Sequence, residues 1–91
     1  MFRIAVACEG IAPELGPRAA LDVAGEFAHR PWHHNVRCEW RGGLLILEAE
    51  NEFDSEGNAV ADEFSDAVAA CVSGAYRVRI TSVVDVSGSA L

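Results

Sequence analysis

The 91-residue sequence predicts an α+β domain in which two helices cover a single antiparallel sheet. Three observations support this prediction. Four segments alternate apolar and polar side chains with the period of two that is typical of half-buried strands. Two other segments place apolar residues three or four positions apart, as amphipathic helices do. Along the chain these patterns follow the order strand, helix, strand, strand, helix, strand.

The first third of the chain is expected to form a strand, a turn and a helix. Residues 2–8 alternate, which predicts a strand with one buried face, and a turn at 9–13 follows it. From 17 to 29, alanine, valine and phenylalanine recur at helical spacing. Pro17 suits the first turn of that helix because its missing N–H would have no partner there, and Pro31 marks the end of the helix.

The middle of the chain is expected to form a hairpin and a second helix. Residues 36–41 alternate, and Gly42-Gly43 is a strong hairpin signal. Residues 44–50 are apolar on both faces at their start, which favours a central strand. The second helix is expected to begin with Asn58 as its N-cap and to be closed by Gly74.

The last alternating segment, residues 76–84, completes the order β-α-β-β-α-β. This order is that of the ferredoxin-like, or split βαβ, sandwich. In that fold the four-stranded antiparallel sheet has the strand order 4-1-3-2, and the two helices lie on one face. We therefore expect a single domain over residues 1–91, with an ordered core at 1–86 and a flexible tail at 87–91.

The composition limits the classes of function. The net charge of −7 opposes nucleic-acid binding, because a phosphate backbone rewards clustered cations. No apolar run approaches the ~20 residues that span a bilayer, so neither a signal peptide nor a membrane partner is expected. Three widely spaced cysteines, Cys8, Cys38 and Cys71, predict buried free thiols in a reducing compartment, and we expect a cytoplasmic protein.

One face of the predicted sheet carries no helix, and we interpret it as a surface for self-association. Apolar side chains lie between charged ones on this face. The apolar side chains would supply the contact of a homodimer, and cross-strand Arg–Glu pairs would set its register. The central strands present no outward aromatic ring, which excludes the stacking platform of RNA-binding sheets. The residues expected at this interface are Arg3, Ala5, Arg37, Glu39, Ile46, Glu48, Arg77 and Arg79.

A second candidate surface is the acidic segment from Glu48 to Asp66. It carries eight of the fourteen acidic residues and no basic residue. Such a segment would attract a basic protein partner by electrostatics. The leading hypothesis is therefore a small acidic interaction or regulatory module without enzymatic activity. The residues expected to bind the partner are Glu50, Glu52, Asp54, Glu56, Asp62 and Glu63.

Two groups of residues have the chemistry of metal ligands, although neither is strong enough to predict a metal or another cofactor. The acidic segment resembles an EF-hand loop in its spacing, but a Glu replaces the usual first Asp and no helix precedes the loop. The histidines are irregularly spaced, and a loop of solvent-exposed imidazoles is the simpler interpretation. The candidate ligands are Glu52, Asp54, Glu56 and Glu63 in the first group, and His29, His33 and His34 in the second.

The sequence contains no recognised catalytic motif, so no catalytic residue is assigned. An alternative hypothesis remains open: a small-ligand or metal-binding regulatory domain, or a minor enzyme. Its site would be formed by the first strand–helix turn, residues 9–13, and the histidine loop, residues 29–34.

Overall fold

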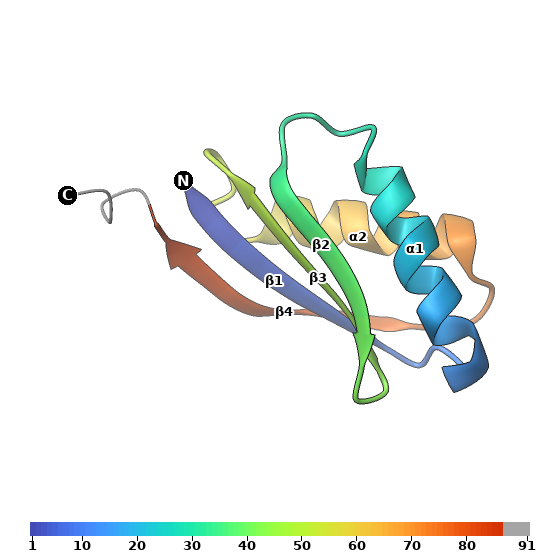
Figure 1. Cartoon of the computed structure of the whole chain (residues 1–91). Helices are drawn as coiled ribbons and strands as arrows, with labels where there is room; N and C mark the ends of the chain where they lie inside the picture. Colours follow the sequence, from blue (N-terminus) through green and yellow to red (C-terminus); the bar gives the residue numbers. More distant parts are fainter. Residues whose placement is uncertain (87–91) are drawn as a thin grey trace.

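The computed structural model describes residues 1–86 and confirms the α+β class, with four antiparallel strands in one sheet and two helices (Figure 1). The expected tail, 87–91, lies outside the described residues. The elements are β1 (Phe2–Glu9), the short 3₁₀ helix η1 (Pro13–Leu15), α1 (Gly16–Phe27), β2 (His34–Arg41), β3 (Leu44–Asn51), α2 (Asn58–Cys71) and β4 (Arg77–Asp85). The strand order is β2-β3-β1-β4.

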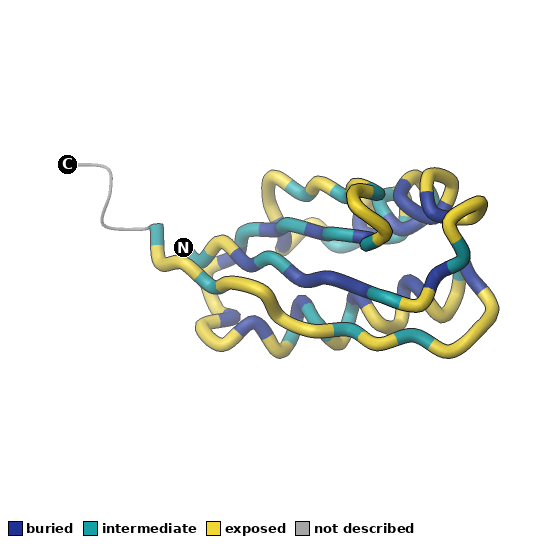
Figure 2. Tube along the Cα trace, turned by 90° about the horizontal axis from the view of Figure 1, so that it is seen from below, coloured by how far each residue is buried: buried dark blue, intermediate teal, exposed yellow. Residues whose placement is uncertain are grey.

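Both helices pack on the same face of the sheet. In the two central strands alternate side chains point to this face, and those from Ile4 to Cys8 and from Leu45 to Ala49 are fully buried. Val23 and Phe27 of α1 and Val60 and Phe64 of α2 join the same cluster. Figure 2 shows the buried positions gathered in the central strands and on the inner sides of the helices, while β4 is mostly exposed. Burial of such side chains contributes about 1.5–3 kcal/mol each, so this face holds the fold together. The buried strand residues are Ile4, Val6, Cys8, Leu45, Leu47 and Ala49.

A glycine allows α1 to approach β2 closely. Gly16 begins the helix with ordinary helical backbone angles, φ −57° and ψ −53°. A Cβ atom at this position would lie 2.1 Å from Cδ2 of Trp40, well inside van der Waals contact. The indole of Trp40 therefore occupies the volume that any larger residue at position 16 would need.

Both edge strands are irregular. In β2 the pairing with β3 shifts between His34 and Arg37, and Asn35 adopts a left-handed conformation with φ 51°. In β4 the register against β1 shifts beside Ala5, where the hydroxyl of Thr81 donates a hydrogen bond to the Ala5 carbonyl over 3.1 Å. Each shift is a β-bulge, in which one strand carries an extra residue and bends.

The bulge in β4 corrects the expected alternation of this strand. Arg77 and Arg79 lie on the open face, as predicted from the sequence. Beyond the bulge the alternation is inverted, so that Val83 pairs with a core-facing residue of β1 and Val84 pairs with Arg3 on the open face. A strict period of two over residues 76–84 was therefore the wrong expectation.

The expected ends of α2 were also wrong. The N-cap is Gly57, in a left-handed conformation with φ 82°, and Asn58 is the first helical residue. At the other end the helix stops at Cys71, and Val72 is already extended, so Gly74 is too far along the chain to close it.

None of the helices within residues 1–86 has the length and apolar character needed to cross a membrane.

Candidate functional site

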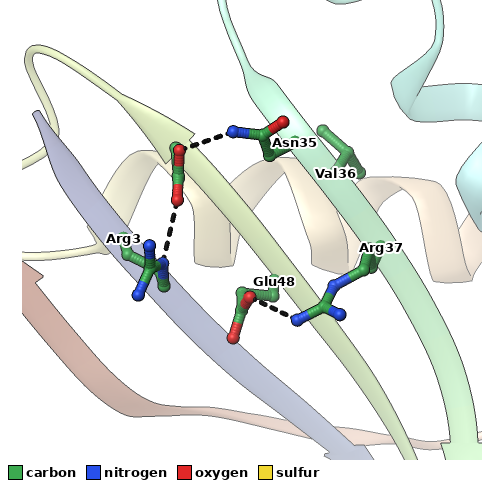
Figure 3. A pocket seen from close by; sticks show the side chains of 6 residues that line it. Arg3, Asn35, Val36, Arg37 and Glu48 are labelled. Carbon is green, nitrogen blue, oxygen red and sulfur yellow. Dashed lines mark hydrogen bonds and ion pairs between the residues drawn. The ribbon is translucent and has the colours of Figure 1, made fainter.

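The open face of the sheet carries a ladder of ion pairs. At one end, the carboxylate of Glu50 accepts hydrogen bonds from Nε of Arg3 and from Nδ2 of Asn35, each at 2.8 Å. Figure 3 shows Arg3 and Asn35 converging on this carboxylate across a shallow hollow, with α2 behind the strands. The hydrogen bond from Asn35, and to a smaller extent that from Arg3, holds the pKa of Glu50 below its usual value.

Further pairs continue across this face. Arg37 donates to Glu48 at 2.8 Å on the neighbouring strand, as Figure 3 also shows. Nitrogen and oxygen atoms are 3.9 Å apart in the pair Arg41–Glu39 and 3.7 Å apart in the pair Arg77–Glu9. Among the arginines of residues 1–86, Arg79 alone forms no ion pair with a described residue.

Small and aliphatic side chains fill the centre of the open face. Ala7 is only 2% exposed although no helix covers it. It pairs with Ile46 on one side and with Arg79 on the other, and both of these residues carry longer side chains. The predicted interface residues therefore share one continuous surface, whose charges are mostly neutralised by neighbours.

Charge is divided unequally between the two layers of the molecule. The strands and the β2–β3 hairpin, residues 2–9, 34–51 and 77–85, carry five arginines and five acidic residues. The remaining described segments, 10–33 and 52–76, carry two arginines and nine acidic residues. We call these two segments the helical side. It holds a formal charge of −7, which equals the net charge of the whole chain.

The loop between β3 and α2 uses part of the predicted partner-binding set for its own structure. Asp54 is 7% exposed, and its carboxylate accepts hydrogen bonds from the backbone N–H groups of Ala59 at 3.1 Å and Val60 at 2.8 Å. It therefore caps α2 from within the loop, where a negative charge also favours the helix dipole. Glu52, Glu56 and Asp62 remain exposed.

A buried polar network connects this loop to the end of α1, and the sequence did not predict it. The side chain of His33 is fully buried, which corrects the expectation of a solvent-exposed imidazole. Its Nδ1 lies 3.2 Å from Nδ2 of Asn51, and its Nε2 lies 3.2 Å from Oε2 of Glu63. The other oxygen of Glu63 lies 2.9 Å from Nε of Arg30. Two members of the predicted acidic surface, Glu50 and Glu63, are thus paired within the protein.

The hydrogen bonds fix the tautomer of His33. The Oδ1 atom of Asn51 accepts the backbone N–H groups of Phe53 and Asp54, so its Nδ2 must face the imidazole. Because that amide nitrogen only donates, Nδ1 of His33 accepts and Nε2–H donates to Glu63. The imidazole is thereby held as a structural bridge between β3 and α2.

Aromatic rings surround this histidine. The ring centroids of Phe27, Trp32 and Phe53 lie 5.6, 5.9 and 6.2 Å from that of His33. Phe27 belongs to the core, whereas Trp32 is 48% exposed and Phe53 is 56% exposed. The arrangement leaves two half-exposed rings resting on a buried imidazole.

The candidate metal ligands do not assemble into a site. No group of three or more His, Cys, Asp or Glu side chains in the described part of the chain is arranged to hold a metal ion. Both carboxylate oxygens of Asp54 accept hydrogen bonds from the backbone of α2, and both ring nitrogens of His33 lie within hydrogen-bond distance of Asn51 or Glu63. His29 and His34 are exposed.

The alternative site is also not brought together. The strand pairing places the end of β1, with Cys8 opposite Leu45, at one end of the sheet. His34, opposite Glu50, lies at the other end. The turn 9–13 and the histidine loop are therefore separated by the length of the sheet (Figure 1).

The three cysteines are free thiols, with Cys8 buried and Cys38 and Cys71 half-buried. Burial, and to a smaller extent the adjacent Glu39 and then Cys71, raises the pKa of Cys38 to about 12. Burial likewise raises the pKa of Cys8 above its ordinary value. Since the thiolate is the nucleophile, these shifts oppose a catalytic role for either residue.

Comparison of the chain with protein-family models, with curated proteins and with solved structures yields no match.

Proposed function

We propose that this protein is a small acidic interaction module, without enzymatic activity, that binds a basic protein partner through its helical side. The observation that supports this proposal is the charge division: the strands are balanced, and the helical side carries a charge of −7. A one-sided negative field accelerates and orients the approach of a cationic surface. Glu52, Glu56 and Asp62 remain exposed on this side to meet it.

We also propose that the open sheet face pairs with that of a second copy. Most of its charges are paired within each copy, and Ile46 supplies apolar contact at its centre. Four strands of eight residues make a face of about 500 Å², given ~3.3 Å per residue and ~4.8 Å between strands. A standard interface buries about 800 Å² per partner, so this pairing is expected to be weak and dependent on concentration.

The ferredoxin-like class and a reducing compartment such as the cytoplasm belong to the same proposal. The interleaved element order and the strand order β2-β3-β1-β4 support the first. The free thiols at positions 8, 38 and 71 support the second.

Binding of a lysine-rich peptide at low and high salt tests the partner proposal. Two double variants change the net charge equally but on different layers: Asp62→Asn with Asp66→Asn on α2, and Glu9→Gln with Glu39→Gln on the sheet. We expect the first to weaken binding about two- to tenfold and the second to have little effect, because each exposed charge contributes up to about 1 kcal/mol. Binding that ignores salt, or that responds equally to both double variants, would contradict the proposal.

Light-scattering mass over a concentration series tests the pairing proposal. Ile46→Asp places a charge at the centre of the open face, and Leu21→Asp makes the same change on the exposed surface of α1, where Leu21 is 71% exposed. We expect the mass to rise with concentration for the wild type and for Leu21→Asp, but not for Ile46→Asp. A wild type that stays monomeric throughout would refute this part.

A further inference from the structure

Two exposed aromatic rings are held at one end of the helical side. Trp32 precedes β2 and Phe53 follows β3, and both rest against the imidazole of His33. About half of each residue is nevertheless exposed, 48% for Trp32 and 56% for Phe53. Two large rings at one place, exposed but supported from below, are typical of an anchor for a partner and not of scattered surface residues.

The imidazole that contacts both rings is held by hydrogen bonds. The side chain of His33 is fully buried and is fixed at both ring nitrogens, by Asn51 and by Glu63. The backbone N–H of Phe53 donates to Oδ1 of Asn51 at 3.2 Å, so the same amide that orients the imidazole also fixes the segment carrying the second ring. A preorganised pair of rings loses little conformational freedom when a ligand binds.

The charges around the rings favour a cation. Glu52 and Glu56 belong to the loop that carries Phe53, and both are exposed. Neither Glu52 nor Glu56 forms an ion pair with another described residue. The arginine of this region, Arg30, is paired with Glu63 at 2.9 Å and lies over the buried ring of Phe27, so it does not neutralise the loop.

We propose that Trp32 and Phe53, together with Glu52 and Glu56, form a docking site for an arginine-bearing segment of the partner. A guanidinium stacks on the face of an aromatic ring and is attracted by its quadrupole, while the carboxylates meet its N–H donors. We call this site the aromatic patch. The inference rests on the proposed function for the sign of the partner's charge, and adds where the partner binds and which side chain anchors it.

Titration with a short arginine-rich peptide, with a glutamate-rich peptide of equal length as a negative control, tests the aromatic patch. The variant Trp32→Leu with Phe53→Leu keeps apolar contact with His33 but removes both ring faces. Leu21→Ala removes an exposed apolar side chain elsewhere on the helical side. We expect the double variant to bind the arginine peptide about five- to thirtyfold more weakly, and Leu21→Ala to bind as the wild type does.

The outcomes separate this inference from the proposed function. If the wild type binds the arginine peptide in a salt-dependent manner and the folded double variant binds equally well, the aromatic patch is refuted while the acidic helical side stands. If the wild type binds neither arginine nor lysine peptides, both are refuted. Loss of self-association in the double variant, measured as light-scattering mass, would identify the patch as a contact between copies and overturn the inference.

A measurement on the unmodified protein guards against a variant that fails to fold. In a nuclear magnetic resonance titration, the indole N–H of Trp32 and the backbone amide of Phe53 should shift with the arginine peptide. The indole of Trp40, which packs against Gly16, is the internal reference and should stay in place. Shifts confined to α2, with both patch signals unmoved, would also overturn the inference.

Discussion

Two glycines of α1 should respond to the same substitution with opposite signs. Gly16→Ala would place a Cβ atom 2.1 Å from Cδ2 and 2.3 Å from Cε2 of Trp40, whereas a Cβ at Gly25 would meet no atom within 4 Å. Neither glycine has a positive φ, so the backbone permits alanine at both positions. The difference between the variants therefore isolates the contact with the indole.

The expected magnitudes follow from these distances. At Gly25 the substitution gains about 0.4–1 kcal/mol, because alanine loses less conformational freedom than glycine on folding. At Gly16 a similar gain is opposed by overpacking of the core, which costs about 1–3 kcal/mol and more where neighbours cannot move. Since the overlap with the ring exceeds 1 Å, we expect Gly16→Ala to lose about 1–2 kcal/mol net.

Thermal unfolding measures both effects. For a chain of this size 1 kcal/mol corresponds to about 4–8 °C in Tm, so Gly25→Ala should melt a few degrees higher than the wild type and Gly16→Ala about 5–15 °C lower. In a Trp40→Leu background the loss caused by Gly16→Ala should largely disappear, because the smaller side chain leaves room for the methyl group. A Gly16→Ala protein as stable as Gly25→Ala would refute the close approach of α1 and β2.

Two further predictions concern the polar contacts. Asp54→Ala should destabilise the protein by about 0.5–2 kcal/mol in chemical unfolding, because the N–H groups of Ala59 and Val60 lose their acceptor, while Glu52→Ala in the same loop should be nearly neutral. The second prediction concerns Glu50, whose pKa is lowered in the folded protein. The stability that its carboxylate contributes is therefore complete above the pKa of the unfolded chain and is lost as the pH falls through the folded pKa. The wild type should lose more stability in acid than Glu50→Gln does, and equal pH profiles of the two proteins would contradict this.

The strands and helices could be predicted from sequence because one buried face imposes a period. Ile4, Val6 and Cys8 repeat every second residue, and Val23 and Phe27 lie one helical turn apart, so each element carries its own signal. The bulge beside Thr81 carries no such signal, because it depends on how β4 pairs with a strand more than seventy residues earlier.

The buried network around His33 could not be predicted for the same reason. Its partners Asn51 and Glu63 come from β3 and α2, and Arg30 comes from the loop after α1. A loop with adjacent polar residues is predicted to be solvent-exposed when the residues that hydrogen-bond to it are far away in the sequence. A weak signal for the capping role of Asp54 was present, since an aspartate three residues before a glycine at a helix start can reach back to the helix N–H groups.

The bulges in the two edge strands affect how copies of this protein can associate. Flat edge strands recruit further strands and allow open-ended growth, but here both outer strands bend at a bulge, beside Asn35 in β2 and beside Thr81 in β4. Neither edge is a straight template for another chain. The pairing of open faces that we propose should therefore close as a two-fold pair instead of extending into a fibre.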